Sequence, residues 1–259
     1  MKIFTDHREV SEKSHGNVYA IGNFDGLHVG HQELLQQTLR ISEEMMKRPA
    51  ILTFDPHPRE FFAPSALPFR LATTAQKTRE LASLGAGLCL NQNFEKDFSV
   101  LTPSEFVRRV LLDSLRAAHL VVGADFKFGY RQSGNTDMLK ELCSQLGIGI
   151  SVVDQIRVGS ETASSSLARD HICEGEMSSA ANVLGRPWSV EAIPVLDNDI
   201  YSFDLSYYTK IKNGEYAVRI DGAPLCATLN ELGDGQQFLS VPSYLNLRRS
   251  SSVIIEFAS

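Results

Sequence analysis

The sequence predicts an α/β protein in which a parallel sheet covered by helices is followed by a small antiparallel β domain. Up to about residue 155, apolar strand-like runs alternate with stretches of helical periodicity, the order typical of parallel βαβ units. The run 119–123 is apolar almost throughout, as expected of a strand buried on both faces. After Pro187 short β-like runs replace the helical pattern. We therefore expect two domains, at residues 1–186 and 187–259.

Five strands are expected in the first domain. Each is a short apolar run bounded by turn residues or by a helical stretch, and they cover residues 18–21, 50–54, 87–90, 119–123 and 148–153. Helical connections imply parallel strands, because a parallel pair needs a long crossover. The carboxyl ends of all five are then expected at one edge of the sheet, where ligands bind in such folds.

Helices are expected between these strands. Residues 29–47 carry apolar side chains at helical spacing before Pro49, namely Leu34, Leu35, Leu39 and Met46. Further helices are expected at 74–84, where Gly85 provides a stop, and at 137–146. Another begins with Thr102 as its N-cap, Pro103 in first position and Glu105 completing a capping box. Its inward-facing residues are Phe106, Val107, Val110 and Leu111.

The last 75 or so residues predict an antiparallel domain of short strands. The β-like runs cover 189–195, 200–208, 215–220, 225–229, 237–241 and 252–257. Turn sequences separate them at 197–198, 213–214, 221–222 and 233–235.

The composition is that of an ordinary globular protein. The net charge of −6 argues against sequence-independent binding of nucleic acid. Four widely spaced cysteines without a Cys-x-x-Cys pair indicate a reducing compartment rather than a disulfide framework. The amino terminus turns polar at once and no apolar run approaches 18 residues, so neither a signal peptide nor a membrane helix is expected. We expect a cytoplasmic protein that binds no membrane.

The segment 22–32, Gly-Asn-Phe-Asp-Gly-Leu-His-Val-Gly-His-Gln, is the most informative part of the chain. It joins a strand to a helix, and its three glycines let the backbone approach an anion closely. The helix N-terminus adds unpaired N–H groups and a positive dipole end. His28 and His31 share one face of a helical turn, where they can bind the phosphates of a nucleotide and stabilise departing pyrophosphate. They are alternatively surface residues, or zinc ligands with Asp25 nearby, but a zinc site needs further ligands.

Other polar motifs also follow predicted strands. Residues 55–58, Asp-Pro-His-Pro, follow the second strand, and residues 123–129 follow the fourth. Residues 164–169, Ser-Ser-Ser-Leu-Ala-Arg, follow the fifth and precede a helix. If the strands are parallel, these motifs converge on the edge that carries the histidines.

Each motif has a structural alternative. Arg169 can pair with Asp170 or Glu174 on its own helix, and the serines at 164–166 can form a simple N-cap. The residues at 55–58 can be only a turn, the alternative that we favour for His57. Asp125 can cap a loop through the backbone. Phe126 and Phe128 can line a ligand pocket or belong to the core, and Lys77 can be a solvated helix residue.

These motifs together resemble the bacterial riboflavin kinase/FMN adenylyltransferase family, the bifunctional FAD synthetases. The resemblance spans roughly residues 17 to 190 and includes segments 22–32, 53–58, 71–77, 123–129, 164–169 and 184–187, with Arg131 and Gly134. It implies a Rossmann-like nucleotidyltransferase domain that converts FMN to FAD with ATP and Mg²⁺.

The resemblance also implies site residues. It implies an ATP site formed by Gly22, Asn23, Phe24, Gly26, His28, Gly30, His31, Ser164, Ser165 and Arg169. Of these, His28, His31 and Arg169 are the catalytic candidates. Asp55, Pro56, Asp125, Phe126 and Phe128 are implied on the flavin side. No dedicated metal cage is expected, because Mg²⁺ usually rides on substrate phosphates with few carboxylates.

The second domain departs from the family pattern. The kinase half of the family opens with a Gly-rich segment leading to Pro-Thr-Ala-Asn, whereas this chain has Ala-Ile-Pro-Val-Leu-Asp-Asn-Asp at 192–199 and no Pro-Thr dipeptide. We therefore expect a shortened relic of the kinase barrel without riboflavin kinase activity. The alternatives are a bifunctional enzyme, a nucleotidyltransferase for another phosphorylated acceptor such as phosphopantetheine, and a non-catalytic flavin or nucleotide sensor.

Overall fold

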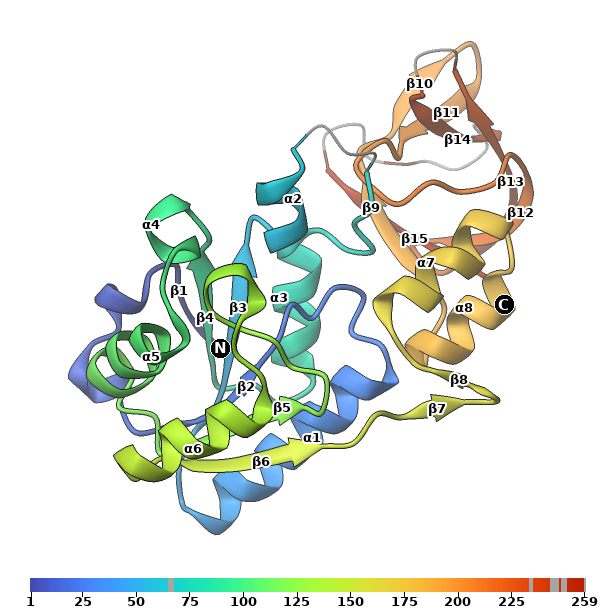
Figure 1. The fold of residues 1–259 in the computed structure, drawn as a ribbon. Helices are drawn as coiled ribbons and strands as arrows, with labels where there is room; N and C mark the ends of the chain where they lie inside the picture. The colour runs from blue at the N-terminus through green and yellow to red at the C-terminus, as the bar shows by residue number, and fades with distance from the viewer. Residues whose placement is uncertain (65–67, 233–234, 243–246, 248–250, 259) are drawn as a thin grey trace. The chain divides into compact units, whose positions relative to one another are not determined.

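A computed structural model describes residues 1–64, 68–232, 235–242, 247 and 251–258 (Figure 1). The chain forms two compact units. One comprises Met1–Phe24, Gly30–Ala66 and Thr78–Ile156 and is called the sheet unit here. The other comprises Asp25–Val29, Leu67–Lys77 and Arg157–Ser259 and is called the half-barrel unit. Two short segments of the first half of the sequence thus belong to the unit that contains the carboxyl terminus.

The sheet unit is built on six parallel strands in the order β1-β4-β3-β2-β5-β6. Their bounds are β1 Lys2–Phe4, β2 Val18–Ile21, β3 Pro49–Asp55, β4 Leu88–Asn93, β5 His119–Gly123 and β6 Gly149–Val153. The parallel sheet and the five expected strands are confirmed. The edge strand β1 was not predicted, because three largely exposed residues give no apolar run.

The expected helices are present around this sheet, and two short helices, α2 Pro58–Phe62 and α4 Lys96–Ser99, were not predicted. The expected ones are α1 Val29–Glu44, α3 Thr74–Ser83, α5 Pro103–Glu105 and α6 Thr136–Leu146, and short 3₁₀ turns lie at η1 His7–Glu9, η2 Glu12–Ser14 and η4 Tyr130–Gln132. Leu34 and Leu35 are buried as predicted. The expectation for Met46 was wrong: α1 ends before it, and its side chain is 91% exposed.

The helix expected to begin at Thr102 is present with its capping box. The Thr102 hydroxyl accepts from the Glu105 backbone, and the Glu105 carboxylate accepts from the Thr102 N–H. That hydrogen bond lowers the pKa of Glu105. The following residues form η3, Phe106–Ser114, which has the wider π-helical turn. Its four predicted inward residues are all buried, and with Leu139 and Cys143 of α6 they pack on one face of the sheet.

The strand order reverses direction beside β2. From β2 the chain proceeds through β3 to β4 on one side, and then returns to place β5 on the other side of β2. In open parallel sheets, ligands bind outside the carboxyl ends of the strands at such a switch point. The loops after Ile21 and after Gly123 therefore leave the sheet at the favoured position for a binding site.

The half-barrel unit contains a seven-stranded antiparallel sheet in the order β10-β11-β14-β13-β12-β15-β9. Its strands are β9 Ser189–Ala192, β10 Val195–Asp197, β11 Ile200–Asp204, β12 Gly214–Ile220, β13 Ala223–Glu231, β14 Gln237–Pro242 and β15 Val253–Phe257. The opposite edges β9 and β10 are joined by two residues only, which span at most about 10 Å. The sheet must therefore curl until its edges approach each other.

Two of the predicted β runs needed correction. The run expected at 189–195 is two strands separated by Ile193-Pro194, because proline lacks the N–H that a continuous ladder requires. The run expected at 200–208 ends at Asp204, after which the chain leaves the sheet. The turn expected at 233–235 includes two residues outside those that the structure describes.

Two helices and a hairpin precede the curled sheet. They are β7 Arg157–Val158, β8 Glu161–Thr162, α7 Ser165–Glu174 and α8 Met177–Leu184. Ala168 and Ile172 of α7 share one hydrophobic core with Trp188, Phe203 and the inner faces of the strands. Leu71, from a distant part of the sequence, belongs to the same core.

None of the helices in the described part of the chain is long and apolar enough to cross a membrane. All four cysteines are free thiols in the structure, and burial raises the pKa of the Cys143 thiol to about 11.

Candidate active site

The loop between β2 and α1 is tightly wound. Phe24, Gly26 and Leu27 have left-handed backbone φ angles of 53°, 74° and 44°. Such a conformation is costly for residues with a side chain and is maintained only where the surroundings require it. Alternating left- and right-handed residues turn successive N–H groups toward one side and create anion-binding concavities. The loop shares with such anion-binding turns the residues of positive φ on either side of Asp25.

The two predicted histidines flank the start of α1. His28 immediately precedes the helix, His31 is its third residue, and both side chains are partly exposed. Phe24 is fully buried and packs against His31 with a ring-centroid distance of 5.0 Å. The first turn of α1 carries no acidic side chain that would compete with an anion for the positive helix end. This arrangement leaves the imidazoles accessible at a helix N-terminus that can bind phosphate.

Gly26 is required by close packing within the half-barrel unit. A Cβ atom at this position would lie 2.6 Å from Leu71 Cδ1 and 3.2 Å from Leu184 Cδ2. The Arg186 guanidinium binds the same loop, because its Nη1 donates to the Gly26 carbonyl at 3.1 Å. The sequence analysis singled out the segment 184–187, but nothing in the sequence indicated this contact of Arg186 with the loop.

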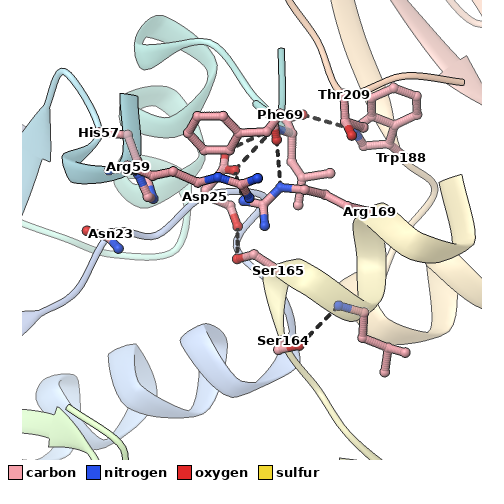
Figure 2. A network of polar contacts seen from close by, with 12 residues as sticks. Asn23, Asp25, His57, Arg59, Phe69, Ser164, Ser165, Arg169, Trp188 and Thr209 are labelled. Carbon is pink, nitrogen blue, oxygen red and sulfur yellow. Dashed lines mark hydrogen bonds and ion pairs between the residues drawn. The ribbon is translucent and has the colours of Figure 1, made fainter. Parts of the chain in front are cut away.

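Asp25 and Arg169 form the centre of a polar network in the half-barrel unit (Figure 2). Arg169 Nη2 lies 2.6 Å from Asp25 Oδ2, and Arg169 Nε donates to the Phe69 carbonyl at 2.6 Å. The two side chains are only 12% and 3% exposed. The structural alternative in which Arg169 pairs with Asp170 or Glu174 was wrong, since its carboxylate partner comes from 144 positions away.

The two predicted serines hold different positions at the start of α7 (Figure 2). Ser164 is the N-cap, and its hydroxyl accepts from the Leu167 N–H at 3.1 Å. Ser165 donates to the Asp25 backbone carbonyl at 2.8 Å. The serine motif and the segment that carries His28 therefore belong to one compact unit, although they are far apart in sequence.

The segment 68–77 connects this network to the curled sheet. Leu71 N–H donates to Asp25, and the Leu71 carbonyl accepts from Trp188 Nε1 at 2.9 Å. Tyr208 donates to Gln76 Oε1 at 2.8 Å. In the same segment Lys77 is 3% exposed, so its interpretation as a solvated helix residue was wrong.

The residues predicted on the flavin side lie at carboxyl ends of strands in the sheet unit. Asp55 is the last residue of β3 and is followed by Pro56, and both are partly buried. Asp125 lies in the exposed turn after β5. Phe126 and Phe128 stack with centroids 5.5 Å apart, and Phe128 is buried in the core. Nearby, the exposed Asn23 accepts through its carbonyl from Thr53 in the neighbouring strand at 3.0 Å.

His57 has a structural role. It is the N-cap of α2, and its Nδ1 accepts from the Arg59 N–H at 3.1 Å. Within the described residues, no group of three or more histidine, cysteine, aspartate or glutamate side chains is arranged to hold a metal ion.

Sequence reasoning missed Asp25 as the partner of Arg169. It noted Asp25 only as a possible metal ligand, whereas the structure shows a buried residue bound by two segments of the half-barrel unit, the one at Leu71 and helix α7. The available signal was an acidic residue between apolar neighbours in the sequence Phe-Asp-Gly-Leu at 24–27. A carboxylate in such a setting needs a charged or N–H partner.

Comparison with known proteins identifies the family. Residues 10–167, more than half of the chain, match the sequence profile of FAD synthetase. The chain belongs to the FAD synthetase family. Its members include nucleotidyltransferases, and the enzyme class expected from the resemblance is thereby confirmed.

Relatives of this FAD synthetase family member include proteins named as bifunctional enzymes and a protein named as an FAD synthetase. It is 27% identical to the bifunctional riboflavin kinase/FMN adenylyltransferase of Buchnera aphidicola subsp. Acyrthosiphon pisum, over 96% of this chain and 81% of that protein. It is 32% identical to the enzyme of the same description from Escherichia coli K12, over 73% of this chain and 61% of that protein. The FAD synthetase of Listeria monocytogenes is 33% identical, over 71% of this chain and 74% of that protein.

One solved structure resembles the whole chain in fold. The crystal structure of a protein described as a macrolide-efflux protein from Streptococcus pneumoniae superposes with a TM-score of 0.85, covering 98% of this chain and 88% of that one. The two sequences are 20% identical, so the likeness shows the fold alone.

Proposed function

We propose that the protein transfers the adenylyl group of ATP to the phosphate of FMN, giving FAD and pyrophosphate. The observation that carries this proposal is the union, in one compact unit, of the His28 segment with the Ser165–Arg169 end of α7. Both are helix starts bearing donors or cationic groups, as polyphosphate binding requires. Family membership supplies the reaction class.

The proposed reaction is an in-line displacement at the α-phosphorus of ATP. A phosphate monoester has a second pKa near 6, so the FMN phosphate is largely dianionic at neutral pH and needs no general base. Catalysis then rests on alignment and on neutralising charge as pyrophosphate leaves. We assign these tasks to His28, His31 and Arg169. The remaining residues of the proposed ATP site are Gly22, Asn23, Phe24, Gly26, Gly30, Ser164 and Ser165.

Arg169 retains donors for this task. Its Nε and one Nη2 N–H contact Phe69 and Asp25, whereas a guanidinium has five N–H groups. Nη1 has no hydrogen-bond partner among the described residues. We propose that Nη1 binds a phosphate oxygen of ATP.

The substrates are proposed to be MgATP and FMN. Mg²⁺ enters on the phosphates of ATP, the usual way in which it reaches such sites. Asp55, Pro56, Asp125, Phe126 and Phe128 are proposed to bind the flavin nucleotide, with Phe126 beside the ring system and the buried Phe128 stacked behind it. An overall acidic chain that acts on small anions is proposed to work in the cytoplasm, without nucleic acid or membrane partners.

We further propose that the chain lacks riboflavin kinase activity and that residues 187–259 are a relic of the kinase barrel. Where a phosphate-binding loop would be needed, residues 193–197 form the short connection Ile193-Pro194 and the edge strand β10. Glu231, a carboxylate candidate for activating a hydroxyl, is paired with Lys210. The catalytic domain is accordingly proposed to be residues 1–186.

The test is to incubate pure protein with ATP, MgCl₂ and one acceptor at a time, and to separate the products by chromatography. FAD from FMN, abolished by EDTA, is expected. If no FAD forms from FMN, the proposal is refuted. An adenylylated product from phosphopantetheine would then favour a nucleotidyltransferase for another acceptor. Binding of FMN without any product would favour a non-catalytic sensor. FMN formed from riboflavin above a no-enzyme control would restore the bifunctional alternative.

A further inference from the structure

Asp25 is the most enclosed charged residue beside the proposed phosphate site. It lies three positions before His28, and its side chain is 3% exposed. Its carboxylate accepts from the Leu71 N–H at 3.1 and 3.3 Å and pairs with Arg169 at 2.6 Å. Its backbone carbonyl accepts from Ser165. The carboxylate and the backbone carbonyl of Asp25 therefore both bind side chains of helix α7 (Figure 2).

We infer that Asp25 is a positioning residue for adenylyl transfer, whose carboxylate orients the Arg169 guanidinium so that Nη1 faces the phosphates. This inference rests on the proposed function. The orientation is determined at two points, because Nη2 is held by Asp25 and Nε by the Phe69 carbonyl. The Phe69 ring lies under the guanidinium, 5.1 Å from its carbon. With Nε and Nη2 held, a planar guanidinium has a defined direction for Nη1.

The same contact offsets the charge of Arg169. Paired with a carboxylate at 2.6 Å, the guanidinium presents directed N–H donors but little net positive charge. The contact with Asp25 should therefore stabilise the transition state, which needs an oriented donor, more than it strengthens the binding of ATP. Its loss should lower kcat with little effect on the KM for ATP. A residue that only maintained the fold would instead weaken ATP binding and catalysis together.

The decisive variant is Asp25→Asn. The amide oxygen can still accept from Leu71, but the amide N–H₂ now faces Arg169 Nη2, so the guanidinium loses its anchor and regains its full charge. We expect kcat for FAD formation to fall about 100-fold, the usual effect of misplacing a reacting group by about 1 Å. The KM for ATP should stay within about threefold of wild type or decrease, by the charge argument.

A matched control comes from the far end of α7. Glu176 accepts from His171 Nδ1 at 2.8 Å, so Glu176→Gln also removes a carboxylate that contacts this helix. Wild-type kcat and KM are expected for it, and circular dichroism checks the fold of every variant. If wild type makes no FAD, the proposed function and this inference both fail. If wild type is active and Asp25→Asn keeps kcat within threefold, only the inference fails.

A double variant tests whether Asp25 acts through Arg169. In an Arg169→Ala background, adding Asp25→Asn should change kcat by less than about threefold, because the group it orients is gone. A further loss of tenfold or more would overturn the inference. This comparison also serves if Asp25→Asn alone fails to fold, since removing both partners of a buried pair is less disruptive than removing one.

Discussion

Gly26→Ala tests whether the tight packing of the histidine loop is needed for activity. The new Cβ would lie 2.6 Å from Leu71 Cδ1 and 3.0 Å from Leu71 Cβ, where ordinary contacts begin near 3.4 Å. Leu71 cannot easily retreat, because its N–H is bound by Asp25 and its carbonyl by Trp188. We therefore expect the loop to shift by roughly 1 Å, which costs about 100-fold in rate when reacting groups are displaced.

The matched control is Gly159→Ala in the same unit. Gly159 has a similar left-handed φ of 60°, but a Cβ there would meet nothing within 4 Å. Both variants incur the backbone cost of alanine at positive φ, about 1–2 kcal/mol. Only Gly26→Ala adds overpacking of about 1–3 kcal/mol, so its melting temperature should lie about 2–12 °C below that of the control.

FAD formation is then measured at a temperature where circular dichroism shows both variants folded. The control should keep the wild-type rate within about twofold, whereas Gly26→Ala should lose about two orders of magnitude. Near-wild-type activity of Gly26→Ala would refute the reasoning that the loop position, and with it His28, depends on this contact.

Three further predictions concern single side chains. His28→Ala and His31→Ala should each lower the rate of FAD formation by about 10²–10³ while leaving the melting temperature near wild type, and a fully active double variant would contradict the site. Arg169→Lys keeps the charge but should lower kcat about 10²-fold, since lysine cannot donate to Asp25, Phe69 and a phosphate in one plane. Equal steady-state rates of the two proteins would make Arg169 purely structural. Tyr208→Phe should lower the free energy of unfolding by about 1–3 kcal/mol in a urea titration, because Gln76 loses the donated hydroxyl hydrogen; an unchanged midpoint would remove Tyr208 from the network.

The parallel sheet was predictable because its signals are local. Each inner strand is an apolar run, and each connection carries helical periodicity or a cap that reads directly from the sequence, as with Thr102 and Glu105. That the motifs after these strands lie at one edge can then be predicted without knowing the strand order, since the carboxyl ends of all strands in a parallel sheet lie at the same edge. The order itself needs tertiary information, and so does the position of the switch beside β2.

The β domain was harder to predict in detail because its strands are short and alternate polar with apolar residues. The run 189–195 looks continuous in hydropathy, yet Pro194 divides it into strands at opposite edges of the sheet. Nothing local indicates that Ser189–Ala192 pairs with Val253–Phe257 at the other end of the domain. Strand pairing over such distances depends on the global fold rather than on residue type.

The candidate site was predictable in its residue types but not in its connections. Glycine and serine at strand and helix ends are recognisable in sequence because each acts through neighbouring backbone, and the histidines because their spacing places them on one helix face. The ion pair of Asp25 with Arg169 has no such local signature, since the partners are 144 positions apart.

The half-barrel unit gives the β domain a structural part in the candidate site. Leu71 lies in one hydrophobic core with Trp188 and Tyr208, so the β domain supplies apolar contacts to the segment that binds Asp25. Trp188 and Tyr208 add hydrogen bonds to the Leu71 carbonyl and to Gln76. Without the domain these groups would lose buried partners that the first half of the chain does not replace. Removing the β domain is therefore expected to disturb the segment that binds Asp25, and with it the orientation of Arg169.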